Sequence, residues 1–98
     1  MGITYNIDRS IEPHSTLQVE LEVTVLFKIS RVSIEGGQGV ILQKVTTAGG
    51  TSLWAKPIEL FKVPAALNLF RPRVAAGLLT FDLMNPTNKS VHFKITIQ

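Results

Sequence analysis

The sequence contains no cysteine among its 98 residues. Disulfide bonds and thiolate metal ligands are therefore excluded as sources of stability. A single chain of this length buries only about 60–65% of the surface that its extended form exposes, so its stability margin is thin. The chain must rely on a well-packed core or on association with other subunits.

Charged residues are scarce as well. Asp, Glu, Lys and Arg make up 17% of the chain, against about 25% in an average soluble domain. A small domain with few charges has apolar surface left over once its own core is filled. We therefore expect part of its surface to contact other protein subunits.

The charges that are present are unevenly distributed. Residues 1–35 carry five acidic and three basic side chains, a net charge of −2, whereas residues 36–98 carry seven basic and two acidic side chains, a net charge of +5. This asymmetry would steer an acidic partner, or let the acidic surface of one subunit meet the basic surface of another. A solvated surface without a partner is the alternative.

Long apolar runs are also lacking. No stretch approaches the length of about 18 residues that indicates a membrane-spanning helix. Residues 1–6 lack the basic start and apolar centre of a secretory signal peptide. These features predict a chain with no membrane span and no signal peptide, synthesised in the cytoplasm and available there for incorporation into a virion.

Residues suited to catalysis are few. The two histidines, His14 and His92, are isolated, and no serine has the Gly-x-Ser-x-Gly surroundings of a hydrolase. Glu20 and Glu22 would project about 7 Å apart from one strand face, but a solvated face explains them better than paired catalytic carboxylates. Residues 36–39, Gly-Gly-Gln-Gly, lack the Lys-Ser/Thr of a phosphate loop and indicate a turn. We predict no enzymatic activity, no catalytic residues, no cofactor and no metal site.

Alternation of apolar and polar residues is the clearest positive signal. Over residues 17–29 every odd position is apolar, and every even position except Leu26 is polar. Period two over this length predicts a strand with one buried and one solvated face. The phase reverses near residues 30–31, because Val32 and Ile34 are apolar at even positions. We expect a β-bulge there, with the chain bending and passing from one sheet to another.

Further strands are predicted on both sides of this segment, at residues 3–7, 40–47, 53–63, 79–83 and 91–97. Pro57 makes its segment either an edge strand or two short strands, because proline cannot donate to a ladder. The turn formers at residues 85–90 predict an antiparallel hairpin between the last two strands. Residues 65–70, between two prolines, are expected to form a connecting loop or at most one helical turn.

These elements amount to seven or eight strands and no convincing helix. We predict an all-β fold, a single small antiparallel β-sandwich of jelly-roll or Greek-key type spanning residues 1–98. An immunoglobulin-like sandwich is the first alternative and a small closed barrel the second. The residues expected in the core share the apolar phase of the strongest strands: Leu21, Val23, Phe27, Phe81, Phe93 and Ile95.

The function expected from this reading is structural. We predict a non-enzymatic assembly protein that acts through protein–protein contacts, most readily as a coat, vertex or decoration subunit of a virus or phage particle, by analogy with other small jelly rolls. The alternative is a carbohydrate-binding or adhesion module, for which Trp54 and Tyr5 are the candidate exposed aromatics. Nucleic acid is not an expected partner, because aromatics make up only 7% of the chain and mostly occupy inward strand phases.

The partners expected are other protein subunits, in a homo-oligomer or a larger assembly. Leu26 and Met84 are candidate contact residues, because they are apolar on otherwise polar strand faces. The segment 70–73 supplies the candidate basic contact. The complete set of interface candidates is Leu26, Phe70, Arg71, Arg73, Met84, Glu20, Glu22 and Glu35, the three glutamates being the acidic partners of the arginines.

Overall fold

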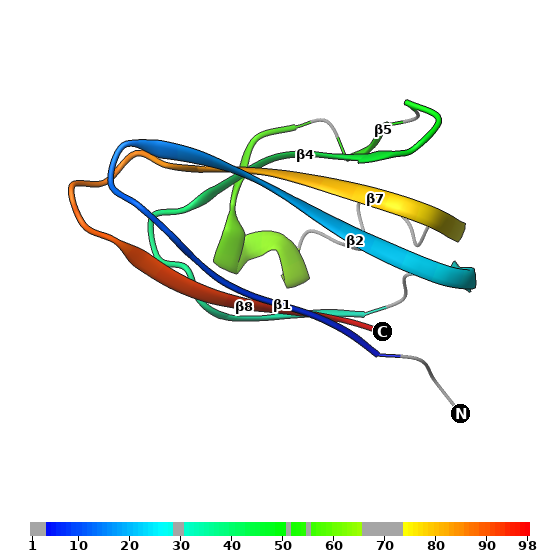
Figure 1. Ribbon diagram of the computed structural model, residues 1–98. Coiled ribbons are helices and arrows are strands. Elements are labelled where there is room, and N and C mark those ends of the chain that lie inside the picture. Colours follow the sequence, from blue (N-terminus) through cyan, green and yellow to red (C-terminus); the bar gives the residue numbers. More distant parts are fainter. Residues whose placement is uncertain (1–3, 29–30, 51, 55, 66–73) are drawn as a thin grey trace.

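Two antiparallel sheets face one another in the structure (Figure 1), a computed structural model that describes residues 4–28, 31–50, 52–54, 56–65 and 74–98. Eight strands and a short 3-10 helix, η1, lie within these ranges. In chain order they are β1 (Tyr5–Ile11), β2 (Ser15–Lys28), β3 (Val32–Gly36), β4 (Ile41–Thr47), β5 (Ser52–Trp54), β6 (Ile58–Glu59), η1 (Leu60–Lys62), β7 (Val74–Asn85) and β8 (Val91–Ile97). The chain continues helically over residues 63–65.

The strand order is that of a rolled-up hairpin. One sheet has the order β1-β8-β3, and the other has the order β2-β7-β4-β5, with β6 also pairing with β4. The first strand thus pairs with the last, the second with the next to last, and β4 with β5 at the centre of the chain. This nested antiparallel pairing defines a jelly roll. The predicted antiparallel sandwich is confirmed.

Cross-strand rows explain why the alternating residues fold in this way. Val19, Phe81 and Val45 are in register on the inner side of the five-stranded sheet. Ile7 and Ile95 are in register on the inner side of the three-stranded sheet. The two inner faces meet in a core of buried residues: Ile7, Ile11, Val19, Val23, Val40, Leu42, Val45, Trp54, Leu60, Val63, Leu79, Phe81, Leu83, Phe93, Ile95 and Ile97.

Most of the predicted core residues belong to this cluster. Val23, Phe81, Phe93 and Ile95 are buried, as expected. Leu21 is half-buried and packs against the cluster from the edge. The side chain of Phe27 lies outside the described part of the structure. Each fully buried apolar side chain of this kind stabilises the fold by about 1.5–3 kcal/mol, so these rows account for much of its stability.

The long alternating segment passes from one sheet to the other, as predicted. β2 belongs to the five-stranded sheet and β3 to the three-stranded sheet. β2 also has a register irregularity between Val23 and Phe27, which are opposite Gly77 and Ala75. The bulge predicted near residues 30–31 is not tested, because residues 29–30 lie outside the described ranges.

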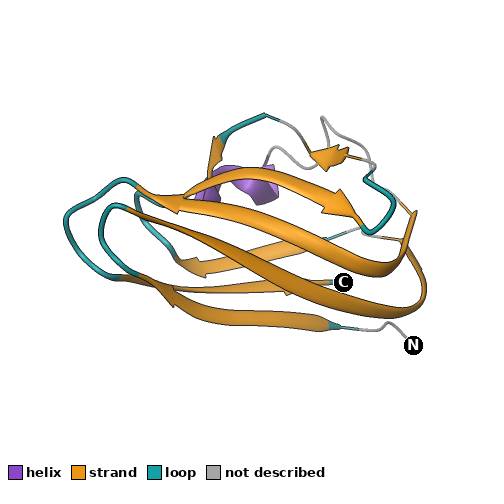
Figure 2. Cartoon of the chain, turned by 45° about the horizontal axis from the view of Figure 1, so that its top comes forward, coloured by secondary structure: helices purple, strands orange, loops and turns teal. Residues whose placement is uncertain are grey.

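The predicted hairpin between residues 79–83 and 91–97 is wrong. β7 pairs with β2 and β4, whereas β8 pairs with β1 and β3. The connection between the two strands therefore crosses from one sheet to the other (Figure 2). Their apolar sides face one another across the core instead of lying side by side in one sheet. The sequence of two facing strands alternates in the same way as that of a hairpin, so the pattern alone did not distinguish the two.

The segment after the central turn is broken more than the sequence suggested. Two short strands, β5 and β6, flank Pro57, which confirms one of the two predicted alternatives. The strand prediction is wrong for residues 60–63, because the chain there turns helically and lies beside β3. Residues 65–70 were predicted to form a connecting loop or at most one helical turn, and all of them except residue 65 lie outside the described residues.

Candidate interaction face

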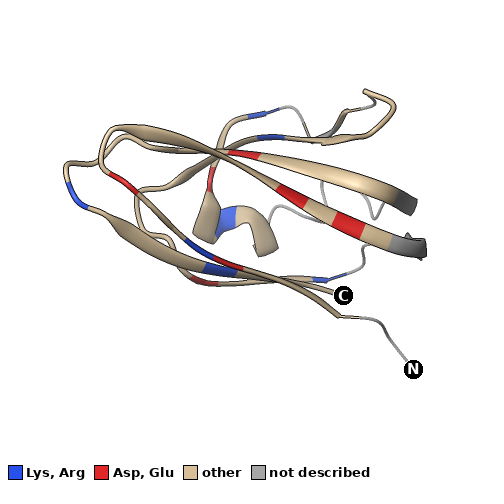
Figure 3. Ribbon diagram, in the orientation of Figure 1, with Lys and Arg blue, Asp and Glu red and all other residues tan. Residues whose placement is uncertain are grey.

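The outward side of the five-stranded sheet carries several of the predicted contact residues. Because side chains alternate along a strand, the even-numbered positions 16–22 of β2 and 78–84 of β7 project from this side. The face defined here as the acidic face consists of Gln18, Glu20, Glu22, Ile41, Lys44, Thr46, Leu78, Thr80, Asp82 and Met84. The acidic positions of β2 and β7 are neighbours in the ribbon (Figure 3).

Apolar residues occupy three positions within this face. Met84 is in register with Ile41 on the neighbouring strand, and both side chains are half-buried. The side-chain amide nitrogen of Gln43 lies 3.7 Å from the sulfur of Met84. Farther along the sheet, the half-buried Leu78 is in register with Glu22. The face therefore has partly exposed apolar surface, and Met84 is on the polar side of its strand, as the sequence predicted.

Acidic side chains border the apolar positions. Glu20 and Glu22 are exposed on β2, the outer strand of the sheet. Asp82 accepts a hydrogen bond of 3.1 Å from Gln18 and is in register with Lys44. Neither glutamate has an ion-pair partner among the described side chains. Their charges are available to an external basic group, and they also discourage unwanted strand addition at this edge.

The structure separates the remaining interface candidates. Glu35 projects from the outer side of the three-stranded sheet, where it is in register with Lys94. It cannot share a contact surface with the two glutamates of β2. Leu26 belongs to β2, but its side chain lies outside the description, as do Phe70, Arg71 and Arg73. Among the candidates whose side chains are described, the acidic face unites Glu20, Glu22 and Met84.

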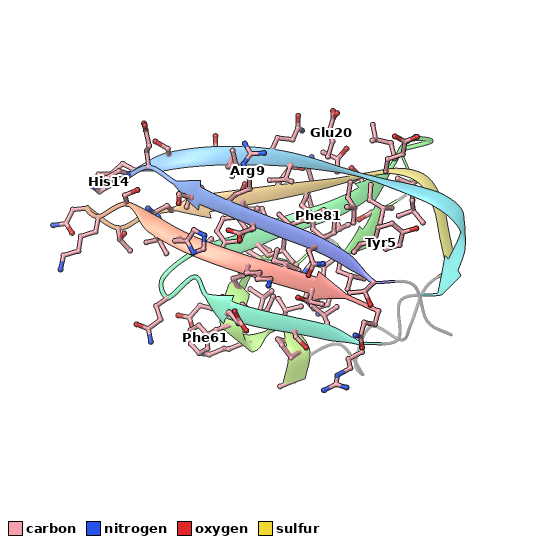
Figure 4. The ribbon with its side chains drawn as sticks, turned by 60° about the horizontal axis from the view of Figure 1, so that its bottom comes forward. Tyr5, Arg9, His14, Glu20, Phe61 and Phe81 are labelled. Atoms are coloured by element: carbon pink, nitrogen blue, oxygen red, sulfur yellow. The ribbon has the colours of Figure 1, made fainter. Side chains whose placement is uncertain are left out.

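The two aromatic residues proposed for carbohydrate stacking are not exposed. Trp54 is buried in the core, and its indole nitrogen donates a hydrogen bond of 2.8 Å to the carbonyl oxygen of Lys56. Tyr5 is half-buried against the same core. Figure 4 shows Tyr5 and Phe81 between the sheets, whereas Phe61 lies at the outside, beside β3. Phe61 was missed because its apolar segment was expected to form a strand.

Phe61 borders an open depression of about 610 Å³ at one end of the sandwich. We call this depression the Phe61 hollow. The connections between β3 and β4 and between β7 and β8 meet there with η1. Its lining consists of Ile34, Gly36, Gly37, Gln38, Phe61, Thr87, Lys89, Ser90, Val91 and His92. The lining thus combines the Phe61 ring with the apolar Ile34 and Val91 and with several polar residues.

The histidines lie in unrelated surroundings. His92 forms a hydrogen bond with Asp8 on the outer side of the three-stranded sheet. His14 lies in the turn between β1 and β2 and has a positive φ of 53°. Within the described ranges there is no group of three metal-ligating His, Asp or Glu side chains. The described part of the chain also has no helix long and apolar enough to cross a membrane.

Comparisons with protein-family models, curated proteins and solved structures found no match to this chain.

Proposed function

We propose that this chain is a non-enzymatic subunit of a protein assembly, and that it uses the acidic face as a contact surface. The observation that carries the proposal is the pair Met84 and Ile41, whose apolar side chains lie on the outward side of a sheet that also carries Asp82, Glu20 and Glu22. An apolar centre with a charged rim is the usual anatomy of a protein–protein contact.

The partner of this face is a second copy of the chain, which meets it with its basic part. Residues 36–98 have a net charge of +5 and include Arg71 and Arg73. Two different surfaces would then meet in a head-to-tail contact, which closes into rings or continues into larger assemblies. Opposite charges on the two surfaces favour this head-to-tail orientation of the two subunits over contacts between like-charged surfaces.

A virus or phage particle is the assembly that we propose. The nested strand order is found in viral coat domains, where small jelly rolls serve as coat, vertex or decoration subunits. This part of the proposal is an analogy at the level of the fold.

The contact can be tested with Met84→Arg. The substitution would place a charged side chain at the apolar centre, so we expect self-association to weaken by at least about tenfold. Ser33→Arg is the matched control, because Ser33 is exposed on the outer side of the other sheet. Light scattering after size-exclusion chromatography measures the association, and circular dichroism verifies the fold. A wild-type chain that stays monomeric at high micromolar concentration would refute self-association.

The proposed attraction between acidic and basic side chains across the contact can be tested separately. The pair Glu20→Lys and Glu22→Lys should weaken association, and so should the pair Arg71→Glu and Arg73→Glu. If the two sets meet across the contact, a mixture of the two doubly substituted chains should associate more strongly than either alone. Raised salt should weaken the wild-type contact, because salt screens exposed charges. Reversal pairs that leave association unchanged would remove these residues from the contact.

A further inference from the structure

We propose that the Phe61 hollow binds a carbohydrate, with one sugar ring stacked on the Phe61 side chain. This inference goes beyond the assembly role and uses none of the residues of the acidic face. It rests on the exposure of the ring, on the rigidity of the surrounding chain and on the hydrogen-bonding groups that line the hollow.

Phe61 is exposed without a structural need for exposure. Its side chain is 48% exposed, and the other large hydrophobic side chains that the structure describes are buried or half-buried. Lys62 holds its ammonium group 5.8 Å from the centre of the ring and forms an ion pair of 3.2 Å with Glu59. An aromatic ring in water forgoes the stabilisation that burial would provide. The part of the ring that Lys62 leaves exposed is therefore available to a ligand.

Two glycines of the lining, Gly36 and Gly37, pack closely against the neighbouring chain. A Cβ atom at Gly36 would lie 2.6 Å from the carbonyl oxygen of His92, and one at Gly37 would lie 2.9 Å from a methyl carbon of Leu60. The amide of Gly37 also donates a hydrogen bond of 3.0 Å to the carbonyl oxygen of His92. Backbone packed this closely forms a fixed wall, and larger residues cannot replace the glycines without displacing it.

The wall formed by the β7–β8 connection is equally well held. The buried Asn85 donates a hydrogen bond of 2.7 Å to the carbonyl oxygen of Lys89. The hydroxyl of Thr87 donates a bond of 2.6 Å to the side-chain oxygen of Asn85. Lys89 and Ser90 are therefore presented by a connection that is already ordered. Binding to an ordered site avoids much of the entropy cost of arranging it.

The chemistry of the lining fits a sugar better than the alternatives. A pyranose has an apolar face of C–H groups, which can stack on an aromatic ring, and a rim of hydroxyls. Gln38, Lys89 and Ser90 have polar side chains that can bond to hydroxyls on the other sides of the hollow. A protein anchor would need a larger apolar cluster than Phe61, Ile34 and Val91 provide. A single-stranded nucleic acid would need successive stacking rings. The volume of about 610 Å³ lies within the range of small-ligand sites.

The experiment is a titration of the ¹⁵N-labelled protein with maltotriose, cellotriose, chitotriose and sialyllactose, followed by NMR. We expect at least one of them to give saturable shifts in the amides of Gln38, Lys89, Ser90 and His92. Phe61→Ala should weaken that binding by about tenfold, whereas Phe61→Tyr, which keeps the ring, should preserve it. Met84→Ala, on the acidic face, is the control and should leave the affinity unchanged.

Three results would overturn the proposal. They are the absence of shifts with all four saccharides, shifts that Phe61→Ala leaves unchanged, and a change of oligomeric state in Phe61→Ala without saccharide binding. The last would assign the ring to a protein contact. Failure of the Met84→Arg experiment would leave this titration unaffected, so the two proposals can be rejected separately.

Discussion

Asn85 shows how one buried polar side chain can order an entire end of the molecule. It is fully buried, and its amide nitrogen lies within 3.1 Å of the carbonyl oxygens of Ile11 and Glu12 as well as 2.7 Å from that of Lys89. Its side-chain oxygen accepts bonds from the amide and the hydroxyl of Thr87. The side chain thus ties the β1–β2 turn to the β7–β8 connection.

Replacing this residue should be costly. We expect Asn85→Ala to lower the free energy of unfolding by about 3 kcal/mol, because it leaves buried carbonyl groups without their donor. Asn85→Asp should be similarly harmful, because a carboxylate cannot donate to carbonyl oxygens. Asn88→Ala, at an exposed position of the same connection, is the control and should change the value by less than about 0.5 kcal/mol. Urea unfolding measures all three, and a loss below about 1 kcal/mol in Asn85→Ala would contradict this account.

At the scale of elements, two glycine turns differ in what their conformation demands. Gly36, at the end of β3, and Gly50, after β4, both have positive φ angles, of 68° and 84°. A side chain at Gly36 would collide with the backbone of β8, whereas nothing lies within 4 Å of a Cβ atom at Gly50. The first turn is therefore restricted by backbone strain and by packing, and the second by backbone strain alone.

The pair of variants Gly36→Ala and Gly50→Ala separates these two effects. Gly50→Ala should lower the free energy of unfolding by about 1 kcal/mol, the usual cost of a left-handed conformation. Gly36→Ala should cost at least about 1 kcal/mol more, because the carbonyl group of His92 must also move. Thermal or urea unfolding compares the two. Equal losses would mean that the contact with β8 relaxes without cost.

At the scale of the whole molecule, stability depends on strands from opposite ends of the chain. β8 is the central strand of the three-stranded sheet and pairs with β1 and β3. Phe93 lies at the middle of β8 and is fully buried. It is in register with Gly36 on one side and with Arg9 on the other. A substitution there should weaken the contact between both sheets.

Two substitutions of the same chemical type test this dependence. Phe93→Ala should cost about 3–5 kcal/mol, because it leaves a cavity in the core. A domain of this size is stable by about 5–10 kcal/mol, so the variant should be close to unfolding. Phe61→Ala removes an exposed ring and should change stability by about 0.5 kcal/mol or less. Urea unfolding of both variants provides the measurement, and similar losses would show that Phe93 is not a core residue.

The amino-acid sequence by itself determined the strands and their faces. Alternation is local, since successive side chains of a strand point to opposite sides whatever the strand pairs with. Val23 and Ile95 were therefore placed inward, and Glu20 and Glu22 outward, before any pairing was known. The break at Pro57 was likewise predictable, because a missing backbone donor acts at its own position.

Only the tertiary structure decided which strands pair and which side chains remain exposed. The alternating sequence of β7 and β8 is compatible with a hairpin and with two strands in facing sheets. In the structure the connection crosses between the sheets, so the two strands belong to different sheets. Asn85 resembled an ordinary turn residue until two connections enclosed it. Phe61 resembled a core residue, yet no described segment covers it fully. Burial depends on neighbours that are distant in sequence, so local patterns cannot determine it.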